Sequence, residues 1–472
     1  MSQLARTASS APAPRDHALA LGLERAAHAP GLTVIAIPAP LGAVAALVDP
    51  IAGVAGSTDA AFAWEPKDAD EAWAGVGIAA EVRASGPDRF AAIARAAAAV
   101  WARVDHDPTA PAPRMFGGFA FAPGTAARGA WRALGDAWFA LPRWTYARRG
   151  GTAWWLLALD AAGARDSGRW FAELAALDGA IAAGPPMTPC PVLARHDIPR
   201  AVWDRQVDDI RAAIARGPIA KVVAARPCEV ELGAPASAAA VMARLGAAHG
   251  ECTRFVIRTG ATAFTGASPE RLIRRRGRTI ESEALAGTIA RAHPDGATAL
   301  LASAKDRGEH ELVVSAITAA LAPFCARDQD GAIALARSDG GALGGPPAVR
   351  ALRHMLHLHT PITAELADSF HVLELARALH PTPAVGGTPT ADAVAWISTH
   401  EPASRGWYTA PVGCFDAAGD GEFAVALRSG LLAGRTAEVW AGAGIVRDSD
   451  AAAEWAEVEL KQRALFGALE GP

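Results

Sequence analysis

Lysine is scarce in this chain, where only four of the 45 basic residues are lysines: Lys67, Lys221, Lys305 and Lys461. The alanine- and glycine-rich composition suggests a GC-rich genome that uses arginine wherever a simple surface charge suffices. A lysine retained despite this bias is a candidate for a function that arginine cannot perform. Arginine stays protonated, whereas a buried lysine can lose its proton and act as a base. Lys67, in the string EPKDAD, is the exception, and we expect it to be a solvated surface residue.

Other absences exclude several classes of protein. The five cysteines are widely scattered and form no CxxC pair, so neither a zinc knuckle nor a disulfide framework is indicated, and free thiols in a reducing cytosol are expected. A net charge of −4 without any run rich in lysine and arginine gives no reason to expect nucleic acid. The N-terminus lacks the apolar core of a signal peptide, and no window of about 20 residues is apolar enough to span a bilayer. These features predict a cytoplasmic protein that binds neither nucleic acid nor a membrane.

The order of apolar runs and turns indicates the fold class. Hydrophobic residues make up 51% of the 472-residue chain, which allows a sizeable core. Predicted strands and helices do not alternate strictly, and many strands look hairpin-linked, which favours an α+β fold with antiparallel sheets. The Ala/Ser/Pro-rich residues 1–15 are predicted to be disordered. Four prolines within residues 182–197 mark a boundary between an N-terminal α/β scaffold region, 16–190, and a second region, 198–472.

Two predicted helices, over residues 299–324 and 451–469, carry carboxylates three positions apart. The pairs are Asp306 with Glu309, in KDRGEHE, and Glu454 with Glu457, in EWAEVELK. At this spacing both side chains project from one helical face, and two such faces could converge on one divalent cation. Carboxylate ligands favour a hard metal, and Mg²⁺ suits a site that adds waters and substrate oxygens. Either pair taken alone is more often a solvated helix face.

Two further residues have surroundings that suit acid and base chemistry. Lys221 begins the apolar strand KVVAA, where partial desolvation favours the neutral amine that a general base requires. Glu270, in the turn GASPERL, is a candidate acid because an apolar pocket favours a protonated carboxyl group. Each has an ordinary alternative, namely a strand-edge lysine that reaches water and a turn carboxylate paired with a nearby arginine.

Several other groups suit an anionic substrate. Arg428, in VALRSGLL, can bind a carboxylate through two hydrogen bonds, and Tyr408 can add a hydroxyl donor. The string AGAG, which contains Gly442, offers backbone N–H groups at close approach, although such turns are common. His357, in HLHT, can stack on a substrate or polarise it, although a lone histidine is more often structural.

Taken together, these motifs resemble those of the chorismate-utilising enzyme family, which includes isochorismate, salicylate, anthranilate and aminodeoxychorismate synthases. The matching strings run in family order from about residue 200: KVVAAR, FTGASPERL, EALAGTIAR, AKDRGEHELVV, HLHTPI, HPTPAVGGTP, RGWYTAPVG, VALRSGLL, AGAGIV and EWAEVELK. Upstream, MFGGFAFAP (115–123) and FALPRW (139–144) resemble the family's N-terminal region. The resemblance implies the fold of anthranilate synthase component I, in which large antiparallel sheets form a sandwich-like core with helices packed outside.

The resemblance also implies a role for each candidate residue. Lys221 matches the base that activates water for attack at C2 of chorismate, and Glu270 matches the acid that protonates the departing C4 hydroxyl. Four carboxylates match a Mg²⁺ site: Glu309 and Glu457 as direct ligands, and Asp306 and Glu454 as outer carboxylates acting through water. The positions that match the substrate pocket are Gly287, Thr288, His357, Ala384, Tyr408, Arg428, Gly442 and Lys461. Lys305, beside the metal-binding face, is expected to be a structural charge.

Within the family, the details resemble the isochorismate synthases. Amine-transferring members usually carry Gln in place of Lys221, and they share with the salicylate synthases a threonine where this chain has Ala384. The resemblance therefore implies a Mg²⁺-dependent isochorismate synthase that feeds salicylate, siderophore or menaquinone synthesis and needs no glutaminase subunit, as a monomer or weak homodimer. A salicylate synthase, which adds pyruvate elimination, and a non-catalytic or partner-dependent subunit remain as alternatives.

Overall fold

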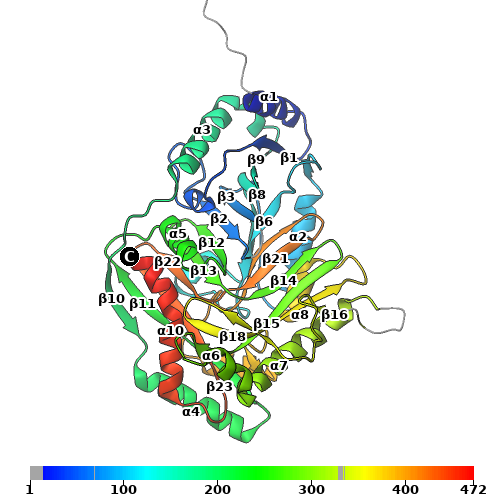
Figure 1. The fold of residues 1–472 in the computed structure, drawn as a ribbon. Helices are drawn as coiled ribbons and strands as arrows, with labels where there is room; N and C mark the ends of the chain where they lie inside the picture. The colour runs from blue at the N-terminus through cyan, green and yellow to red at the C-terminus, as the bar shows by residue number, and fades with distance from the viewer. Residues whose placement is uncertain (1–13, 68–69, 328–332, 334, 472) are drawn as a thin grey trace, which may run out of the picture.

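Two large β-sheets with helices on their outer faces make up the computed structural model, which describes residues 14–67, 70–327, 333 and 335–471 (Figure 1). The larger sheet has the strand order β10 (Val192–Asp197), β11 (Lys221–Leu232), β23 (Thr436–Ile445), β22 (Ser429–Ala433), β13 (Thr262–Ser268), β12 (Thr253–Thr259), β2 (Ala60–Glu65), β3 (Glu71–Val76), β8 (Trp144–Arg149), β9 (Thr152–Leu159), β1 (Leu32–Pro38) and β5 (Val104–His106). The short strand β19 (Gly387–Thr388) pairs with β11. Every pairing in this sheet is antiparallel except that of β1 with β5.

The smaller sheet is antiparallel. Its order is β16 (Leu335–Arg337), β18 (Met355–Glu365), β15 (Thr279–Ala290), β14 (Arg271–Arg276), β21 (Gly421–Val425), β20 (Pro411–Asp416), β6 (Arg114–Phe119), β7 (Ala137–Leu141) and β4 (Ala80–Ala84), with β17 (Ala348–Ala351) also on β18. Each sheet takes strands from before and after the proline-rich segment at 182–197, which runs from the end of α3 through β10.

The main hydrophobic core lies between the two sheets. Phe62 of β2 in the larger sheet packs on Phe116 and Trp138 of the smaller sheet, with ring centroids 6.1 and 5.5 Å apart. Phe264 of β13 likewise meets Trp407, 6.3 Å away. Aromatic side chains bury large apolar areas, so these contacts hold the sheets face to face.

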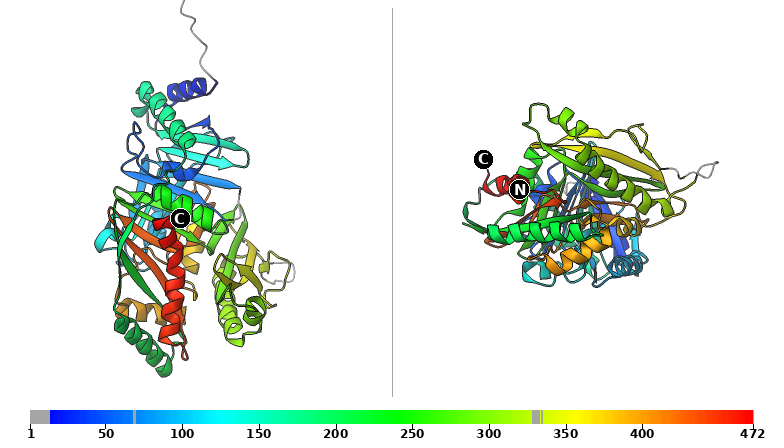
Figure 2. Two further views of the ribbon diagram at one scale, coloured as in Figure 1. Left: turned by 60° about the vertical axis from the view of Figure 1, so that its left-hand side comes forward. Right: turned by 90° about the horizontal axis from the view of Figure 1, so that it is seen from below.

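Helices cover the outer surfaces of the sandwich. They are α1 (Pro14–Ala26), α2 (Arg89–Trp101), α3 (Ser167–Ala183), α4 (Arg200–Arg216), α5 (Ala238–Ala248), α6 (Gly296–Ala302), α7 (Ala304–Leu321), α8 (Val372–Leu379), α9 (Thr390–His400) and α10 (Ala451–Glu470). Short 3₁₀ turns occur at η1 (Val44–Leu47), η2 (Gly129–Ala133), η3 (Gly163–Arg165) and η4 (Ala322–Phe324). Figure 2 shows that α10 and the pair α6 and α7 lie on different parts of the molecule: α10 packs on β23 of the larger sheet, and α7 on β15 of the smaller one.

Two predictions about local structure need correction or restriction. The helix predicted over 299–324 is broken at Ser303, whose hydroxyl accepts a hydrogen bond from the N–H of Asp306 and so begins a new helix, α7. Of the predicted disordered segment, residues 1–13 lie outside the described residues, whereas Pro14 and Arg15 begin α1. All five cysteines are buried and free. In the described part of the chain, no helix has both the length and the apolar character needed to cross a membrane.

Candidate active site

A cavity of about 190 Å³ lies where strands of both sheets meet α7 and α10. Every residue predicted for the site lines it: Lys221, Glu270, Gly287, Thr288, Asp306, Glu309, His357, Ala384, Tyr408, Arg428, Gly442, Glu454, Glu457 and Lys461. Apolar walls that the motifs did not single out come from Val223, Leu285, Met355, Val385 and Leu427. The fold thus brings together residues spread over more than half of the chain.

Lys221 enters the cavity from the first position of β11. Its side chain is buried, and Nζ lies 3.6 Å from Oε2 of Glu309. Gly444, on the paired strand β23, makes room for it, because a Cβ atom there would lie 2.5 Å from Cε of Lys221. The AGAG string therefore has a steric function: it leaves space for the candidate base.

Glu270 lies in the turn between β13 and β14, with its side chain buried in the cavity wall. Burial, assisted by the negative charge of Glu283, raises its pKa to about 8, although Lys67 and Lys221 oppose this. At neutral pH the carboxyl group is therefore mostly protonated and can donate a proton. The cavity therefore brings the side chain of Lys221 together with a protonated carboxyl group.

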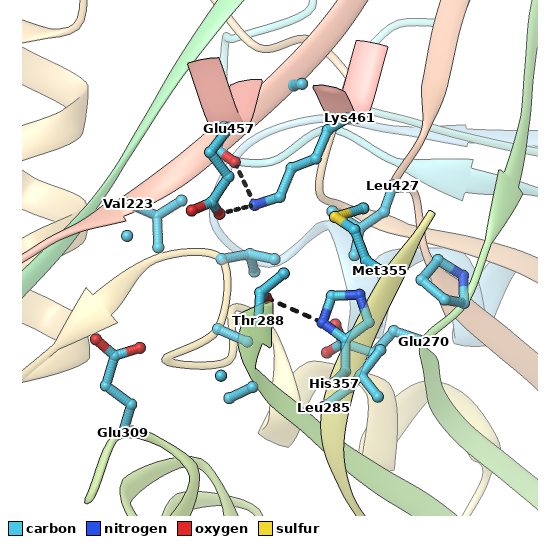
Figure 3. A pocket seen from close by; sticks show the side chains of 18 of the residues that line it. Val223, Glu270, Leu285, Thr288, Glu309, Met355, His357, Leu427, Glu457 and Lys461 are labelled. Atoms are coloured by element: carbon cyan, nitrogen blue, oxygen red, sulfur yellow. Dashed lines mark hydrogen bonds and ion pairs between the residues drawn. The ribbon is translucent and has the colours of Figure 1, made fainter. Parts of the chain in front are cut away.

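The four candidate metal ligands reach the cavity from two helices. Figure 3 shows that Glu309, from α7, and Glu457, from α10, approach it from different sides. Lys461 binds Glu457 at 2.7 Å and lowers its pKa against the effect of burial, while burial raises the pKa of Glu454, which accepts a hydrogen bond from Ser449 at 2.7 Å. No cluster of three or more His, Cys, Asp or Glu side chains in the described residues is tight enough to hold an ion. The donors are all carboxylate oxygens, which fits a hard cation that also takes ligands from substrate and water.

The β15–β18 pair shapes the opposite wall. Gly287 forms a bulge in β15 with a φ of 73°, and a Cβ atom there would lie 3.0 Å from Cβ of Asp306. The bulge places Thr288 directly opposite His357, so that its Oγ1 lies 3.0 Å from Nδ1 of the imidazole (Figure 3). Burial, with Arg428 and Lys461 nearby, lowers the pKa of His357 to about 3, so the ring is neutral. Its Nε2 is buried and has no hydrogen-bond partner among the residues that the structure describes.

Three cationic or phenolic groups complete the pocket. Arg428 is buried with a φ of 48°, and its Nη1 lies 3.6 Å from Sγ of Cys252. Tyr408 stacks on Trp440, and burial raises its pKa, so the hydroxyl keeps its proton as a donor. Lys461 donates to the carbonyl of Gly442 at 2.8 Å. Lys305, expected to be a structural charge beside the metal-binding face, lines the cavity itself.

The prediction for Lys67 is wrong. Its side chain is only 2% exposed, forms an ion pair with Glu283, and donates to the carbonyl of Pro269 at 2.8 Å, directly before Glu270. Neither Lys67 nor Glu283 was singled out as a site residue. The scarcity of lysine was the available signal, but the acidic neighbours of Lys67 in sequence favoured a solvated position.

Comparisons with known proteins identify the family of this chain. The model of a family described as "Chorismate binding enzyme" matches residues 43–470. The salicylate biosynthesis isochorismate synthase of Pseudomonas aeruginosa is 36% identical over 435 residues, which are 86% of this chain and 84% of that protein. The structure of MenF, the menaquinone-specific isochorismate synthase from Escherichia coli, superposes with a TM-score of 0.77 at 28% identity, covering 96% of this chain and 100% of that one.

Anthranilate synthase component I from Streptococcus pneumoniae shares the fold, with a TM-score of 0.65 at 18% identity over 85% of this chain and 93% of that one. The predicted fold class, with large antiparallel sheets like those of that protein, is confirmed. The resemblance seen in the motifs is confirmed as well, because the family match spans nearly the whole chain. The chain belongs to the chorismate binding enzyme family.

Proposed function

We propose that the protein is an isochorismate synthase, which converts chorismate to isochorismate. The observation that carries the proposal is that Lys221 and the protonated Glu270 line the same cavity as two pairs of carboxylates. In the reaction, the amine of Lys221 takes a proton from water as the water oxygen bonds to C2. The ring double bonds shift, the C4–O bond breaks, and Glu270 protonates the departing hydroxyl so that it leaves as water. One water enters and one leaves, so no oxidant or second substrate is needed.

The remaining residues bind and orient chorismate. Arg428 and Tyr408 suit the enolpyruvyl carboxylate, because a guanidinium and a phenol both donate hydrogen bonds. Glu309 and Glu457 would hold Mg²⁺, with Asp306 and Glu454 acting through water. When bound, the ion would neutralise the ring carboxylate and act as a Lewis acid. The apolar side chains in the cavity wall lower the local dielectric, which strengthens these interactions.

A product assay tests the proposal. Purified protein would be incubated with chorismate and Mg²⁺, and the products separated by chromatography. Isochorismate alone supports the main proposal. Salicylate with pyruvate supports a salicylate synthase. This is the second candidate because the Pseudomonas aeruginosa relative is named for salicylate biosynthesis. No turnover would support a non-catalytic or partner-dependent subunit.

The same assay tests self-sufficiency. Water as the nucleophile would remove the need for a glutaminase, so turnover should occur without a partner and without ammonia. Reaction in ¹⁸O-labelled water should place the label in the C2 hydroxyl of isochorismate. Incorporation of ammonia instead would overturn the choice of nucleophile. A role in salicylate, siderophore or menaquinone synthesis, and a cytoplasmic location, are part of the proposal.

A further inference from the structure

The ion pair between Lys67 and Glu283 joins the two halves of the chain directly behind Glu270. Lys67 follows β2 of the larger sheet, whereas Glu283 lies within β15 of the smaller sheet. The side chains of Lys67 and Glu283 are 2% and 6% exposed, so this pair is among the most buried charges near the cavity. Burying a charge costs folding free energy unless the charge is paired, so Lys67 is held in the interior by its ion pair and is not a surface residue.

The pair holds the peptide groups on both sides of Glu270. Lys67 donates to the carbonyl of Pro269 at 2.8 Å, and Oε1 of Glu283 accepts from the backbone N–H of Arg271 at 2.6 Å. The residue between these two contacts is Glu270. Its own carbonyl accepts from the N–H of Val425 at 3.1 Å. The backbone that carries the candidate acid is therefore fixed before, at and after the residue.

Glu283 is kept ionised by positive charges and by hydrogen bonds to its carboxylate. Its Oε2 accepts from Nη1 of Arg350 at 3.0 Å and lies 3.0 Å from Nε2 of His359. Burial alone would raise the pKa of Glu283, but Lys67, His359 and Arg350 outweigh it and hold that pKa well below its ordinary value. A fixed negative charge therefore lies beside the carboxyl group of Glu270.

We propose that Lys67 and Glu283 are positioning residues for the acid Glu270: they fix its backbone and set the balance of charge around its carboxyl group. This inference rests on the proposed function, in which Glu270 is the acid. It assigns a part in the active site to the N-terminal region, which the motifs had treated as scaffold. The two charges act in opposite directions on Glu270, since the anion favours its protonated form and the cation its ionised form.

The opposite signs make the inference testable. The titratable and charged groups facing Glu270 and Glu283 come from seven segments of the chain: Lys67, Lys221, Glu283, Arg350, His359, and Arg271 with its partner Glu422. Removing the negative charge by Glu283→Gln should lower the pKa of Glu270. Removing the positive charge by Lys67→Met should raise it, and the double variant should fall near the wild-type value because both charges are gone.

The experiment follows the carboxyl group directly. The infrared C=O band of protonated Glu270, identified by its loss in Glu270→Gln, would be titrated without substrate in each variant. We expect a midpoint about one pH unit lower in Glu283→Gln, and a shift in the opposite direction in Lys67→Met. Glu65→Gln is the matched control, because Glu65 ends β2 and forms a partly buried pair with Arg254, 3.1 Å away, without contacting the Glu270 turn. Its midpoint should not move.

The pH dependence of kcat is an independent test. Glu270 must be protonated to donate its proton, so kcat falls as pH rises through the pKa of Glu270. The alkaline limb of kcat should therefore move to lower pH in Glu283→Gln and to higher pH in Lys67→Met, while Lys67→Arg keeps the wild-type limb. Shifts of equal sign, or none, would overturn the inference. Because the infrared titration needs no turnover, its result stands apart from whether isochorismate is the product.

Discussion

At the scale of single residues, Lys221 carries the sharpest expectation. We predict that Lys221→Arg lowers kcat by roughly 10²–10⁴-fold, the usual contribution of a general base, because a guanidinium cannot accept a proton at neutral pH. Positive charge near Glu309 is retained in this variant, so a role limited to the ion pair at 3.6 Å would leave activity largely intact. Initial rates of chorismate consumption, with circular dichroism to verify folding, decide between the two. Substantial turnover by the variant would exclude Lys221 as the base.

Residue identity and order were enough to predict which residues the fold gathers at the candidate site. Four short strings contain Lys221, Glu270 and the four carboxylates, and the fold gathers all of them around one cavity. The burial of Lys67 could not be predicted from its neighbours in sequence, because its ion-pair partner, Glu283, is 216 positions away on a strand of the other sheet. A local string such as EPKDAD indicates solvent exposure, and nothing in it reports which distant carboxylate will cover the ammonium group. Burial of a side chain by residues distant in sequence is the feature of the candidate site that could not be predicted from the sequence.

At the scale of elements, helix ends and bulges decide where the carboxylates point. The sequence pattern over 299–324 predicts a helix but not the break at Ser303, because a serine inside an apolar period is also compatible with a continuous helix. Ser303, three residues before Asp306, caps the new helix α7, and this helix carries Asp306 and Glu309 to the cavity. The bulge at Gly287 similarly could not be read from LAGT, since only its pairing with β18 reveals the extra residue.

The bulge in β15 gives the second prediction. Gly287→Ala places a methyl group 3.0 Å from Cβ of Asp306 on a backbone with φ of 73°, which side chains rarely adopt. We expect a loss of about 1–3 kcal/mol in the free energy of unfolding and a larger relative loss of kcat/KM, because Thr288 and Asp306 would both shift. Gly277→Ala is the control for strain alone, since it has a φ of 59° in the β14–β15 turn with open space around it. Equal losses of kcat/KM in both variants would show that the bulge has no special link to the site.

At the scale of the whole molecule, the cavity is a junction between the two sheets. The larger sheet contributes Lys221 and, through α10, Glu454 and Glu457; the smaller sheet contributes Thr288 and His357 and, through α7, Glu309. Glu309 of α7 and Glu457 of α10 approach the cavity from different sides, and the described residues form no ready-made metal-binding cluster there. A divalent cation and a dianionic substrate bound together would therefore join α7 to α10. Binding should stabilise the entire sandwich rather than one of its parts.

This arrangement predicts a cooperative stabilisation that is measurable by thermal unfolding. Chorismate with Mg²⁺ should raise Tm more than the sum of their separate effects, and a ligand at 100 times its Kd contributes about 2.7 kcal/mol. Glu457→Gln should weaken the Mg²⁺ titration by at least about 10-fold, because a neutral amide is a poorer ligand for a hard cation than a carboxylate. Glu459→Gln is the matched control: it lies on the same helix, is exposed, and bonds Trp455 outside the cavity. If Glu457→Gln and Glu459→Gln give the same Mg²⁺ titration, Glu457 is not a ligand. If the increases in Tm from Mg²⁺ and from chorismate are simply additive, the two sheets are not joined through the ion.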